Sequence, residues 1–356
     1  MRCRWTLLAH QARPCVLLTK RNSPMPANLH DSFSRTISYL RISLTDQCNL
    51  RCLYCRSITG EEQLARLDLL SFAEIMRVVR VAVGLGIAKV RLTGGEPLVR
   101  AGVASFVREL AAIPGLAEIR LTTNGVLLAP MAAELYQAGV RKLNISLDSL
   151  KRQRFAEITG GDCFERVWAG IEEARRIGFA PIKINVVVMA GVNDDEVVDF
   201  ARLAFDQPLH VRFIEFMPIG SGNAWAESRY LPASQIRARL ESAFGALAPL
   251  SSHKLDGPAR LFAMPGAQGT IGFISPLSDH FCDTCNRLRL TSAGKLRSCL
   301  LTDRETDIKS ILRGGGSDQE IEALILATIR EKPKGHSLVE TGVIGSCHGQ
   351  MSRIGG

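Results

Sequence analysis

The chain carries the stretch Cys48-Asn49-Leu50-Arg51-Cys52-Leu53-Tyr54-Cys55 directly after a short apolar segment that reads as a strand. Its three thiols have C-x3-C-x2-C spacing, so one loop can bring all of them to a single metal centre. Thiolates select zinc, copper(I) and iron–sulfur clusters, whereas structural zinc takes four protein ligands and usually shows paired C-x2-C units. Three cysteines without a nearby fourth therefore favour a four-iron cluster with one open iron over ordinary buried thiols.

This spacing, with the aromatic residue Tyr54 before the last cysteine, resembles the signature of the radical S-adenosylmethionine (SAM) superfamily. The resemblance implies that Cys48, Cys52 and Cys55 hold a 4Fe-4S cluster whose open iron takes the amino and carboxylate groups of SAM. It also implies that an electron from the cluster cleaves the sulfonium and yields a 5′-deoxyadenosyl radical. In such an enzyme the cofactor carries the difficult chemistry, and the protein supplies position and the exclusion of water.

The length of 356 residues is enough for one large α/β domain and a smaller one. Hydrophobic residues at 46% and charged residues at 22% are typical of a globular protein with a sizeable core. No apolar run reaches the roughly 20 residues of a membrane span, so we expect no membrane association. The 10 cysteines include two short groups, which indicate metal ligands in a reducing compartment and predict a cytoplasmic location.

Residues 1–30 form a weakly patterned basic leader with no acidic residue. Such a leader resembles a mitochondrial transit peptide, which would place the protein in the mitochondrial matrix. The alternative is a translated upstream stretch with Met25 as the working start, and the short, Ser-poor leader favours this second interpretation. The rest of the chain is only mildly basic, which suits a polyanionic small molecule as well as nucleic acid.

From Tyr39 onward the sequence alternates strand and helix patterns, with Gly or Pro at most junctions. The expected strands are Tyr39–Leu44, Lys89–Thr93, Glu118–Thr122, Lys142–Ser146, Ile182–Val188 and Val211–Glu215. The expected helices are Phe72–Leu85, Ala104–Ala112, Pro130–Ala138, Phe164–Ile177 and Asp195–Ala204. This order predicts an α/β protein whose parallel sheet has helices outside, either doubly wound or curled into a barrel.

Alternation within the strands decides between these two folds. A parallel strand covered on both faces reads as nearly continuous apolar sequence, but here every second residue is polar. The polar positions are Arg41, Arg91, Thr93, Asn144, Ser146, Lys183 and Asn185. A closed eight-stranded barrel fills its lumen with bulky apolar side chains. The pattern therefore predicts an open partial TIM-type barrel of about six β/α units, with a wet, ligand-filled lumen and its site toward the strand carboxyl ends.

The segment Thr93-Gly94-Gly95-Glu96-Pro97 follows the second expected strand. Its two glycines let the backbone approach a ligand closely, and Glu96 can accept a hydrogen bond from an ammonium group. Alone, the segment is typical of a plain turn. One strand after the cysteine loop, it resembles the methionine-binding motif of the radical SAM superfamily.

A second set of three cysteines, Cys282, Cys285 and Cys299, lies beyond the β/α repeat. The segment before it contains two short expected strands, Leu261–Met264 and Thr270–Ser275. One interpretation of the cysteine spacing is a zinc site that takes a histidine as fourth ligand. The two candidates for that ligand are His280 and His348.

Arg287 and Arg289 alternate just after the second cysteine set, which places two guanidinium groups on one side of an extended segment. Such groups suit bidentate phosphate recognition. The alternative is the solvated face of a hairpin.

Both cysteine sets together resemble the GTP 3′,8-cyclase family of molybdenum-cofactor biosynthesis. The resemblance runs from about Asp31 to Gly356, and one departure is Arg56-Ser57, where the family usually has Met-Pro. The matching segments are Asp31–Arg35, Leu40–Ser43, Arg91–Pro97, Leu121–Gly125, Arg212–Met217, Cys285–Arg289 and the final Gly355-Gly356.

This resemblance implies a lyase that converts GTP to (8S)-3′,8-cyclo-7,8-dihydroguanosine 5′-triphosphate, the first step of molybdenum cofactor biosynthesis. It implies two 4Fe-4S clusters, the second held by Cys282, Cys285 and Cys299 with its open iron at the guanine. The residues implied around SAM are Tyr54, Gly95, Ser146 and Met217. The residues implied around GTP are Arg41, Arg91, Thr122, Lys183, Arg287, Leu288 and Arg289. The implied catalytic groups are the first cysteine set together with Arg287, Arg289, Gly355 and Gly356.

The expected organisation follows from these assignments. Residues 31–241 form the partial barrel, 242–330 a smaller C-terminal α+β region with the second cluster, and 331–356 a tail that reaches the active-site cavity. The family further implies a homodimer, a downstream cyclic pyranopterin monophosphate synthase and an external electron donor such as flavodoxin.

Two other protein classes remain open at this point. One is a different enzyme with two clusters, such as a peptide-modifying maturase, whose second cluster serves electron transfer. The cations of the lumen favour a polyphosphate substrate over that class. The other is a zinc-stabilised nucleic-acid-binding protein. Aromatic residues make up only 6% of the chain and do not interleave with a basic stripe, so we expect no nucleic-acid partner.

Overall fold

The computed structural model describes residues 29–55, 64–65, 67–219, 227–251, 257–336, 347 and 351–355. The expected leader, apart from its last two residues, lies outside this part of the chain. Arg56, Ser57, His348 and Gly356 lie outside it as well.

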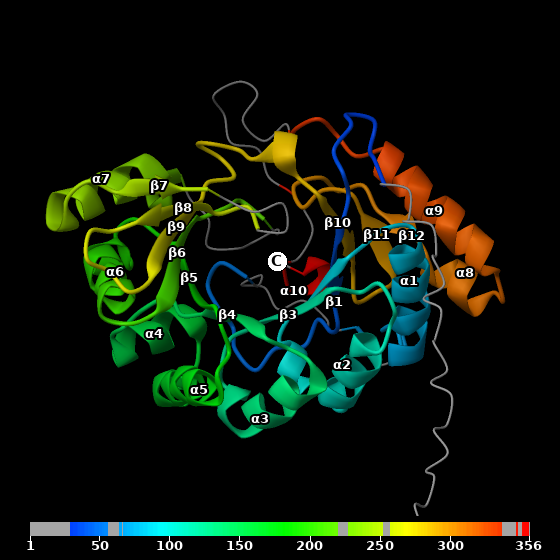
Figure 1. The fold of residues 1–356 in the computed structure, drawn as a ribbon, viewed down its shortest axis with the longest axis horizontal. Helices are drawn as coiled ribbons and strands as arrows, with labels where there is room; N and C mark the ends of the chain where they lie inside the picture. The colour runs from blue at the N-terminus through cyan, green and yellow to red at the C-terminus, as the bar shows by residue number, and fades with distance from the viewer. Residues whose placement is uncertain are drawn as a thin grey trace, which may run out of the picture.

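The described strands join one 12-stranded sheet in the order β12-β11-β10-β1-β2-β3-β4-β5-β6-β9-β8-β7. From β10 to β9 all neighbours in this order are parallel, and the outer pairs are antiparallel. The strands are β1 (Tyr39–Ser43), β2 (Lys89–Thr93), β3 (Glu118–Thr123), β4 (Lys142–Ser146), β5 (Ile182–Val188), β6 (Leu209–Glu215), β7 (Ala248–Leu250), β8 (Arg260–Ala263), β9 (Thr270–Ile274), β10 (Arg287–Leu290), β11 (Lys295–Arg297) and β12 (Thr306–Asp307). The sheet curves without closing, because β12 and β7 remain separate edges (Figure 1). This confirms the predicted open partial barrel.

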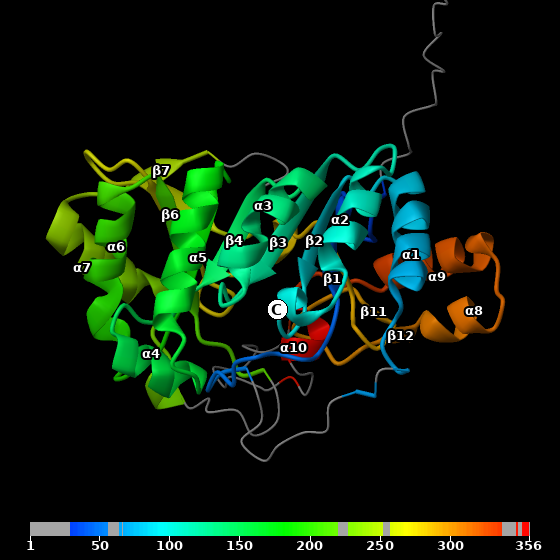
Figure 2. The same cartoon turned by 90° about the horizontal axis from the view of Figure 1, so that it is seen from below.

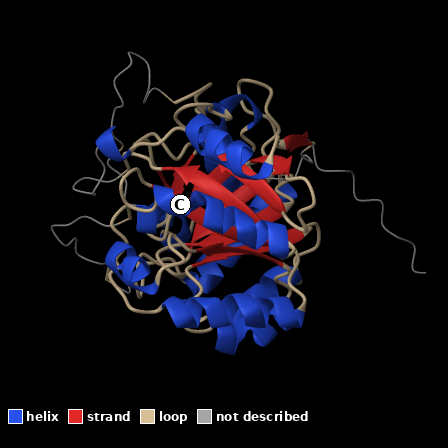
Figure 3. Cartoon of the chain, turned by 90° about the vertical axis from the view of Figure 1, so that its left-hand side faces the viewer, coloured by secondary structure: helices blue, strands red, loops and turns tan. Residues whose placement is uncertain are grey.

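Helices cover the outer face of the curved sheet (Figure 1), and Figure 2 shows α1, α2, α3 and α5 in front of the strands. The strands occupy the centre when the molecule is viewed from the side (Figure 3). The helices are α1 (Phe72–Gly84), α2 (Val103–Ala111), α3 (Leu128–Ala138), α4 (Arg152–Thr159), α5 (Phe164–Ile177), α6 (Val197–Asp206), α7 (Ala233–Phe244), α8 (Lys309–Arg313), α9 (Asp318–Arg330) and α10 (Met351–Ile354). Among the described residues, none of the helices combines the length and the apolar character that crossing a membrane requires.

Helix α1 shows why the local sequence folds as it does. Ser71 caps its first turn, since the Ser71 hydroxyl accepts from the Glu74 N–H (3.1 Å) and the Glu74 carboxylate accepts from the Ser71 N–H (2.6 Å). Ile75, Val78 and Ala82 follow at helical spacing and are all buried. The helix therefore turns one apolar stripe to the sheet, as the sequence pattern predicted.

The polar strand positions line the concave face of the sheet. Arg41 pairs in register with Arg91 of β2 on one side and with Arg289 of β10 on the other. In parallel strands, residues in register project to the same face, so these three arginines face the lumen together. The intervening residues Leu40 and Ile42 are fully buried under the helices. The predicted polar lumen is thus present.

The C-terminal residues do not form a separate layer. Strand β9 pairs with β6, and β10 pairs with β1, so the segment after residue 241 extends the barrel sheet at both ends. The two strands expected near residues 261–275 are present as β8 and β9. The alternative of a solvated face for Arg287 and Arg289 is wrong. The segment does form a hairpin with β11, but β10 also pairs with β1, and Arg289 is only 5% exposed.

We expect Leu121→Ala to lower the free energy of unfolding by about 2–5 kcal/mol, because Leu121 is fully buried in β3 and its removal leaves a cavity. Leu67→Ala is the control, since Leu67 is 84% exposed and its change should stay within about 0.5 kcal/mol. Urea-induced unfolding of both variants measures the difference. Equal losses would show that β3 does not pack as described.

Candidate active site

Two cavities lie side by side on the concave side of the sheet. The first cavity, of about 1030 Å³, is lined by Cys48, Cys52 and Cys55. The second, of about 1050 Å³, is lined by the three cysteines of the other set. The residues that line both cavities are Thr122, Asn185, Ile214 and Met217. Both spaces include room that is open to solvent, and ligands bound in the two cavities would meet at the shared wall.

The first cavity brings together every residue that the sequence assigned to SAM. Tyr54, Gly95, Ser146 and Met217 all line it, together with the three cysteines. These residues come from the ends of β2, β4 and β6 and from the loop after β1. Met351 of α10 adds a wall that the sequence did not predict.

Gly94 and Gly95 are required by a close approach of two backbone segments. A Cβ atom on Gly94 would lie 2.4 Å from the Thr45 carbonyl oxygen, and one on Gly95 would lie 2.3 Å from that of Gln47. In this arrangement the Gly95 N–H donates to the Thr45 oxygen at 2.7 Å. The glycine pair thus fastens the end of β2 to the segment that leads into Cys48.

The Glu96 carboxylate has a different role from the one expected. It is fully buried and accepts hydrogen bonds from the Thr123 hydroxyl (2.8 Å) and from the N–H groups of Asn124 (2.6 Å) and Leu98 (3.0 Å). Burial raises the pKa of Glu96 to about 7, against the opposing pull of these donors. The expected contact of Glu96 with an ammonium group is wrong. The Glu96 carboxylate binds the loop after β3 and does not line the first cavity.

The second cavity is strongly cationic. Five arginines line it, namely Arg41, Arg91, Arg212, Arg287 and Arg289. Burial, with Arg91 and Arg287 nearby, lowers the pKa of Arg41 to about 10 although Tyr39 counteracts the shift. The described residues that line this cavity include no carboxylate. Such a surface suits a ligand with several negative charges.

Cations also surround the second cysteine set. Burial opposes ionisation of the Cys285 thiol, but Arg287 and Lys332 together lower its pKa to about 6. The Arg287 Nη2 lies 3.3 Å from the Cys285 sulfur. Lys332 is 3% exposed and donates to the backbone oxygens of Arg287 (2.9 Å) and Ser298 (2.5 Å). No sequence pattern indicated Lys332, which lies in the segment after α9.

Two residues that were expected to contact the nucleotide do not line the second cavity, and one residue that was not expected does. Leu288 packs in the hydrophobic core at 1% exposure, so only its main chain can face the cavity. Lys183 is on the lumen face in register with Asn144, yet it is 4% exposed and is not part of the cavity lining. Arg212 does line the cavity and was missed. Its alternation with Phe213 in β6 is the signal that could have identified it.

The chain end reaches the same cations. The Gly355 carbonyl accepts from Arg41 Nε at 3.2 Å and from Arg289 Nη1 at 2.6 Å. Gly355 has φ of 72°, and a Cβ atom there would lie 2.4 Å from the Thr93 hydroxyl oxygen. Only glycine fits this position without strain. Figure 1 shows α10, which leads into it, inside the curve of the sheet.

The donor sets of both cavities fit iron–sulfur clusters better than single ions. Within the described ranges, no three His, Cys, Asp or Glu side chains converge closely enough to hold one metal ion. A mononuclear zinc site needs four ligands at about 2.0–2.3 Å, whereas the cysteines around a four-iron core stand further apart because the core lies between them. Each cavity offers three thiols, the number that holds a four-iron cluster and leaves one of its irons open.

Arg35 fixes the segment that carries Cys282. Its Nη1 donates to the backbone oxygens of Cys282 (2.8 Å) and Lys334 (3.0 Å), and its Nη2 donates to that of Pro333 (2.7 Å). The Asp31 carboxylate, whose side chain is fully buried, orients the guanidinium through Nε at 2.5 Å. The N-terminal segment therefore positions a cysteine more than two hundred residues away.

Comparison with known proteins agrees with this geometry. The sequence matches the family described as "Radical SAM superfamily" over residues 42–204 and "Molybdenum Cofactor Synthesis C" over residues 209–338. A protein named GTP 3′,8-cyclase from Pelotomaculum thermopropionicum is 47% identical over 92% of this chain and 100% of its own length. One of the same name from Moorella thermoacetica is 49% identical over 87% of this chain and 95% of its own.

Solved structures share the fold at low identity. Streptococcus suis SuiB bound to S-adenosylmethionine has a TM-score of 0.59 and 12% identity, over 89% of this chain and 77% of that one. Native anSMEcpe with bound AdoMet has a TM-score of 0.54 and 16% identity, over 83% and 81%. At these identities the likeness shows the fold alone.

We expect Arg35→Lys to weaken iron binding at the second cysteine set about tenfold, because lysine cannot reproduce the forked contacts with three carbonyl groups. Chelator competition measures this in a chain whose first set, Cys48, Cys52 and Cys55, is replaced by Ala. Arg77→Lys is a matched control, since Arg77 also binds a carboxylate and a carbonyl but lies away from both cavities. Equal chelator sensitivity of the two variants would contradict the assignment.

Proposed function

The chain belongs to the GTP 3′,8-cyclase family of the radical SAM superfamily, and we propose that it converts GTP to (8S)-3′,8-cyclo-7,8-dihydroguanosine 5′-triphosphate. This reaction is the first step of molybdenum cofactor biosynthesis. The observation that carries the proposal is the wall shared by the two cavities, formed by Thr122, Asn185, Ile214 and Met217. It allows the 5′ carbon of SAM in the first cavity to meet the ribose of GTP in the second.

The two cysteine sets would each hold a 4Fe-4S cluster, Cys48, Cys52 and Cys55 the first and Cys282, Cys285 and Cys299 the second. When bound, the first cluster would supply the electron that cleaves SAM to methionine and a 5′-deoxyadenosyl radical, and that radical would take the C3′ hydrogen of GTP. C3′ would then bond to guanine C8, and the guanine radical so formed would need one further electron and one proton to give the 7,8-dihydro product. The protein's own task is then to hold the ribose between the two sets and to keep water away. Apolar groups at the shared wall, Ile214 and Met217, support the exclusion of water.

The arginines of the second cavity would bind the triphosphate. Arg41, Arg91 and Arg289 are in register across β2, β1 and β10, so their guanidinium groups can engage one phosphate chain. Thr122 lies beside them, because its hydroxyl accepts from Arg91 Nη1 at 3.1 Å. Arg287 and the second cysteine set lie further along the cavity, where the guanine would bind.

The finer assignments rest on the family. We propose a lyase that acts as a homodimer, takes electrons from an external donor such as flavodoxin and passes its product to a cyclic pyranopterin monophosphate synthase. We propose the cytoplasm as its location. The mitochondrial alternative depends on the leader, nearly all of which lies outside the described residues.

The other two classes have less support. A peptide-modifying enzyme does not explain five arginines in one cavity, and the solved structures of similar fold are at most 16% identical among those compared above. A zinc-stabilised module needs four ligands that converge on one ion, whereas among the described residues no three His, Cys, Asp or Glu side chains do so.

The two cysteine sets should be separable. We expect Cys55→Ala to abolish reductive cleavage of SAM, and Cys285→Ala to retain some cleavage but to stop cyclisation of GTP. Both activities are measured after anaerobic reconstitution, with iron and sulfide analysed in parallel. Cys163→Ala is the control, because Cys163 belongs to neither cavity. Cyclisation at the wild-type rate by Cys285→Ala would exclude the second assignment.

The tail should act in turnover and not in assembly. Deletion of Gly355 and Gly356 is expected to leave both clusters and GTP binding intact while product formation collapses. Gly355→Ala should act in the same direction, since a Cβ atom would meet the Thr93 hydroxyl. Gly335→Ala is the control, because open space surrounds that glycine. Full turnover by the truncated protein would disprove a role for the tail.

A further inference from the structure

Tyr54 is tied to the end of the fourth strand through its hydroxyl group. This hydroxyl donates to Asp148 Oδ2 at 2.6 Å, and Asp148 Oδ1 accepts from the Val187 N–H of β5 at 2.9 Å. Asp148 is 2% exposed, and Tyr54, Asp148 and Val187 all line the first cavity. One carboxylate therefore joins the cysteine loop to the ends of β4 and β5.

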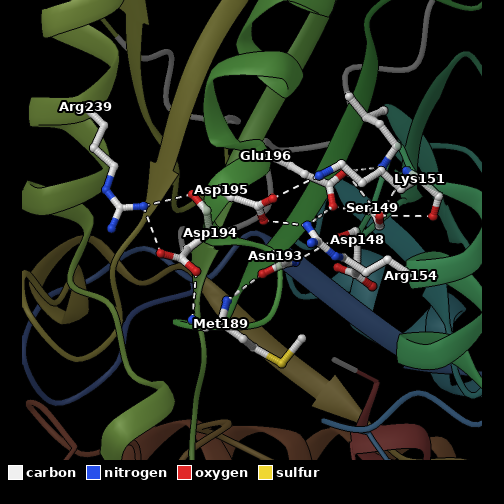
Figure 4. A network of polar contacts seen from close by, with 12 residues as sticks. Asp148, Ser149, Lys151, Arg154, Met189, Asn193, Asp194, Asp195, Glu196 and Arg239 are labelled. Atoms are coloured by element: carbon white, nitrogen blue, oxygen red, sulfur yellow. Dashed lines mark hydrogen bonds and ion pairs between the residues drawn. The ribbon is translucent and has the colours of Figure 1, made fainter.

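Asn193 binds the backbone of Asp148, as Figure 4 shows. Its Nδ2 donates to the backbone oxygens of Asp148 (2.7 Å) and Val187 (2.9 Å), and its Oδ1 accepts from the Met189 N–H (2.8 Å). Asn193 is 1% exposed and does not line the cavity. All three bonds run to backbone, so this amide fixes the two strand ends relative to each other.

Glu196 binds the turn after Asp148 (Figure 4). Its carboxylate accepts from the Ser149 hydroxyl (2.8 Å), the Leu150 N–H (2.7 Å) and Arg154 Nη1 (2.6 Å). Glu196 is fully buried. Two buried side chains of the β5–α6 connection, Asn193 and Glu196, therefore hold the backbone around Asp148 in place.

Backbone hydrogen bonds on both sides of Cys52 also hold the cysteine loop. The Arg51 N–H donates to the Thr159 oxygen (2.7 Å) and the Leu53 N–H to the Ile158 oxygen (2.9 Å) at the end of α4. The Tyr54 hydroxyl adds a tether in the turn between the last two cysteines. The position of this turn decides where the metal centre stands against the cavity.

Asp148 can serve the cavity in two ways: by binding a ligand directly or by acting through Tyr54. Each of its oxygens already accepts one bond within the protein, from Tyr54 on one side and from Val187 on the other. We propose that Asp148 is a positioning residue that sets the Cys52–Cys55 turn through the Tyr54 hydroxyl, and that Asn193 holds Asp148 for this role. The inference rests on the proposed function, since it takes SAM as the ligand of the first cavity.

A double-mutant cycle on the reconstituted holoenzyme tests the proposal. We expect Tyr54→Phe and Asp148→Ala each to weaken SAM binding about tenfold in equilibrium dialysis, at unchanged iron content. The double variant should be no weaker than the single ones, because both changes break the same bond. A tenfold loss for Asp148→Ala alone, with Tyr54→Phe unchanged, would show direct binding and overturn the proposal. Additive losses would overturn it as well.

A second readout does not depend on the cofactor. In the metal-free chain, amide hydrogen exchange of residues 51–55 should be faster in Tyr54→Phe and in Asn193→Ala than in the wild type. Unchanged exchange in Tyr54→Phe would mean that the tether does not order the loop. Tyr136→Phe on α3 is the matched control and should change neither exchange nor SAM binding. If the wild-type holoenzyme itself failed to bind SAM, the proposed function would be wrong. The exchange experiment would still show whether the Tyr54 hydroxyl orders residues 51–55.

Discussion

Buried carboxylates at the ends of alternate strands hold the rim of the open barrel together. Glu96 follows β2, Asp148 follows β4 and Glu215 ends β6, and each is at most 2% exposed. Each accepts hydrogen bonds from a neighbouring element: the loop after β3, the backbone of β5, and the start of α7 with the loop after β9. An ionised carboxylate only accepts, so it can satisfy several N–H groups where chains leave a sheet. Both cavities depend on this rim, because their lining residues stand on the loops that it fixes.

The same construction places cations where water cannot easily reach them. Arg41, Arg91 and Arg289 share one level of the lumen, and the described lining of the second cavity offers them no carboxylate. Isolating a charge from water costs several kcal/mol unless a partner compensates. Here the Gly355 carbonyl and the Thr122 hydroxyl supply part of that compensation. A polyphosphate would supply far more, so the lumen is arranged for its substrate at some expense to the stability of the chain alone.

Much of the candidate site follows from short patterns. The spacing of Cys48, Cys52 and Cys55 indicates one metal centre, and the alternation of Arg41 and Arg91 with apolar residues predicts a polar lumen. The bounds of β2, β4, β5 and α5 agree with the sequence pattern because each has a clear period and a Gly or Pro nearby. Helices α4, α7, α8, α9 and α10 were not predicted. Two of them, α8 with 5 residues and α10 with 4, are too short for a helical period to show in the sequence.

The sequence by itself determined the fold class, the two cysteine sets and the cationic character of the lumen, since side-chain chemistry and local periodicity carry that information. Only the tertiary structure decided that β10 lies parallel beside β1, which sets Arg289 next to Arg41 and turns Leu288 into the core. It also decided that Glu96 serves the rim, that Arg35 reaches Cys282 and that Lys183 lies apart from the cavity lining. Pairing between segments far apart in the chain depends on the loops and layers between them, and no local period records it.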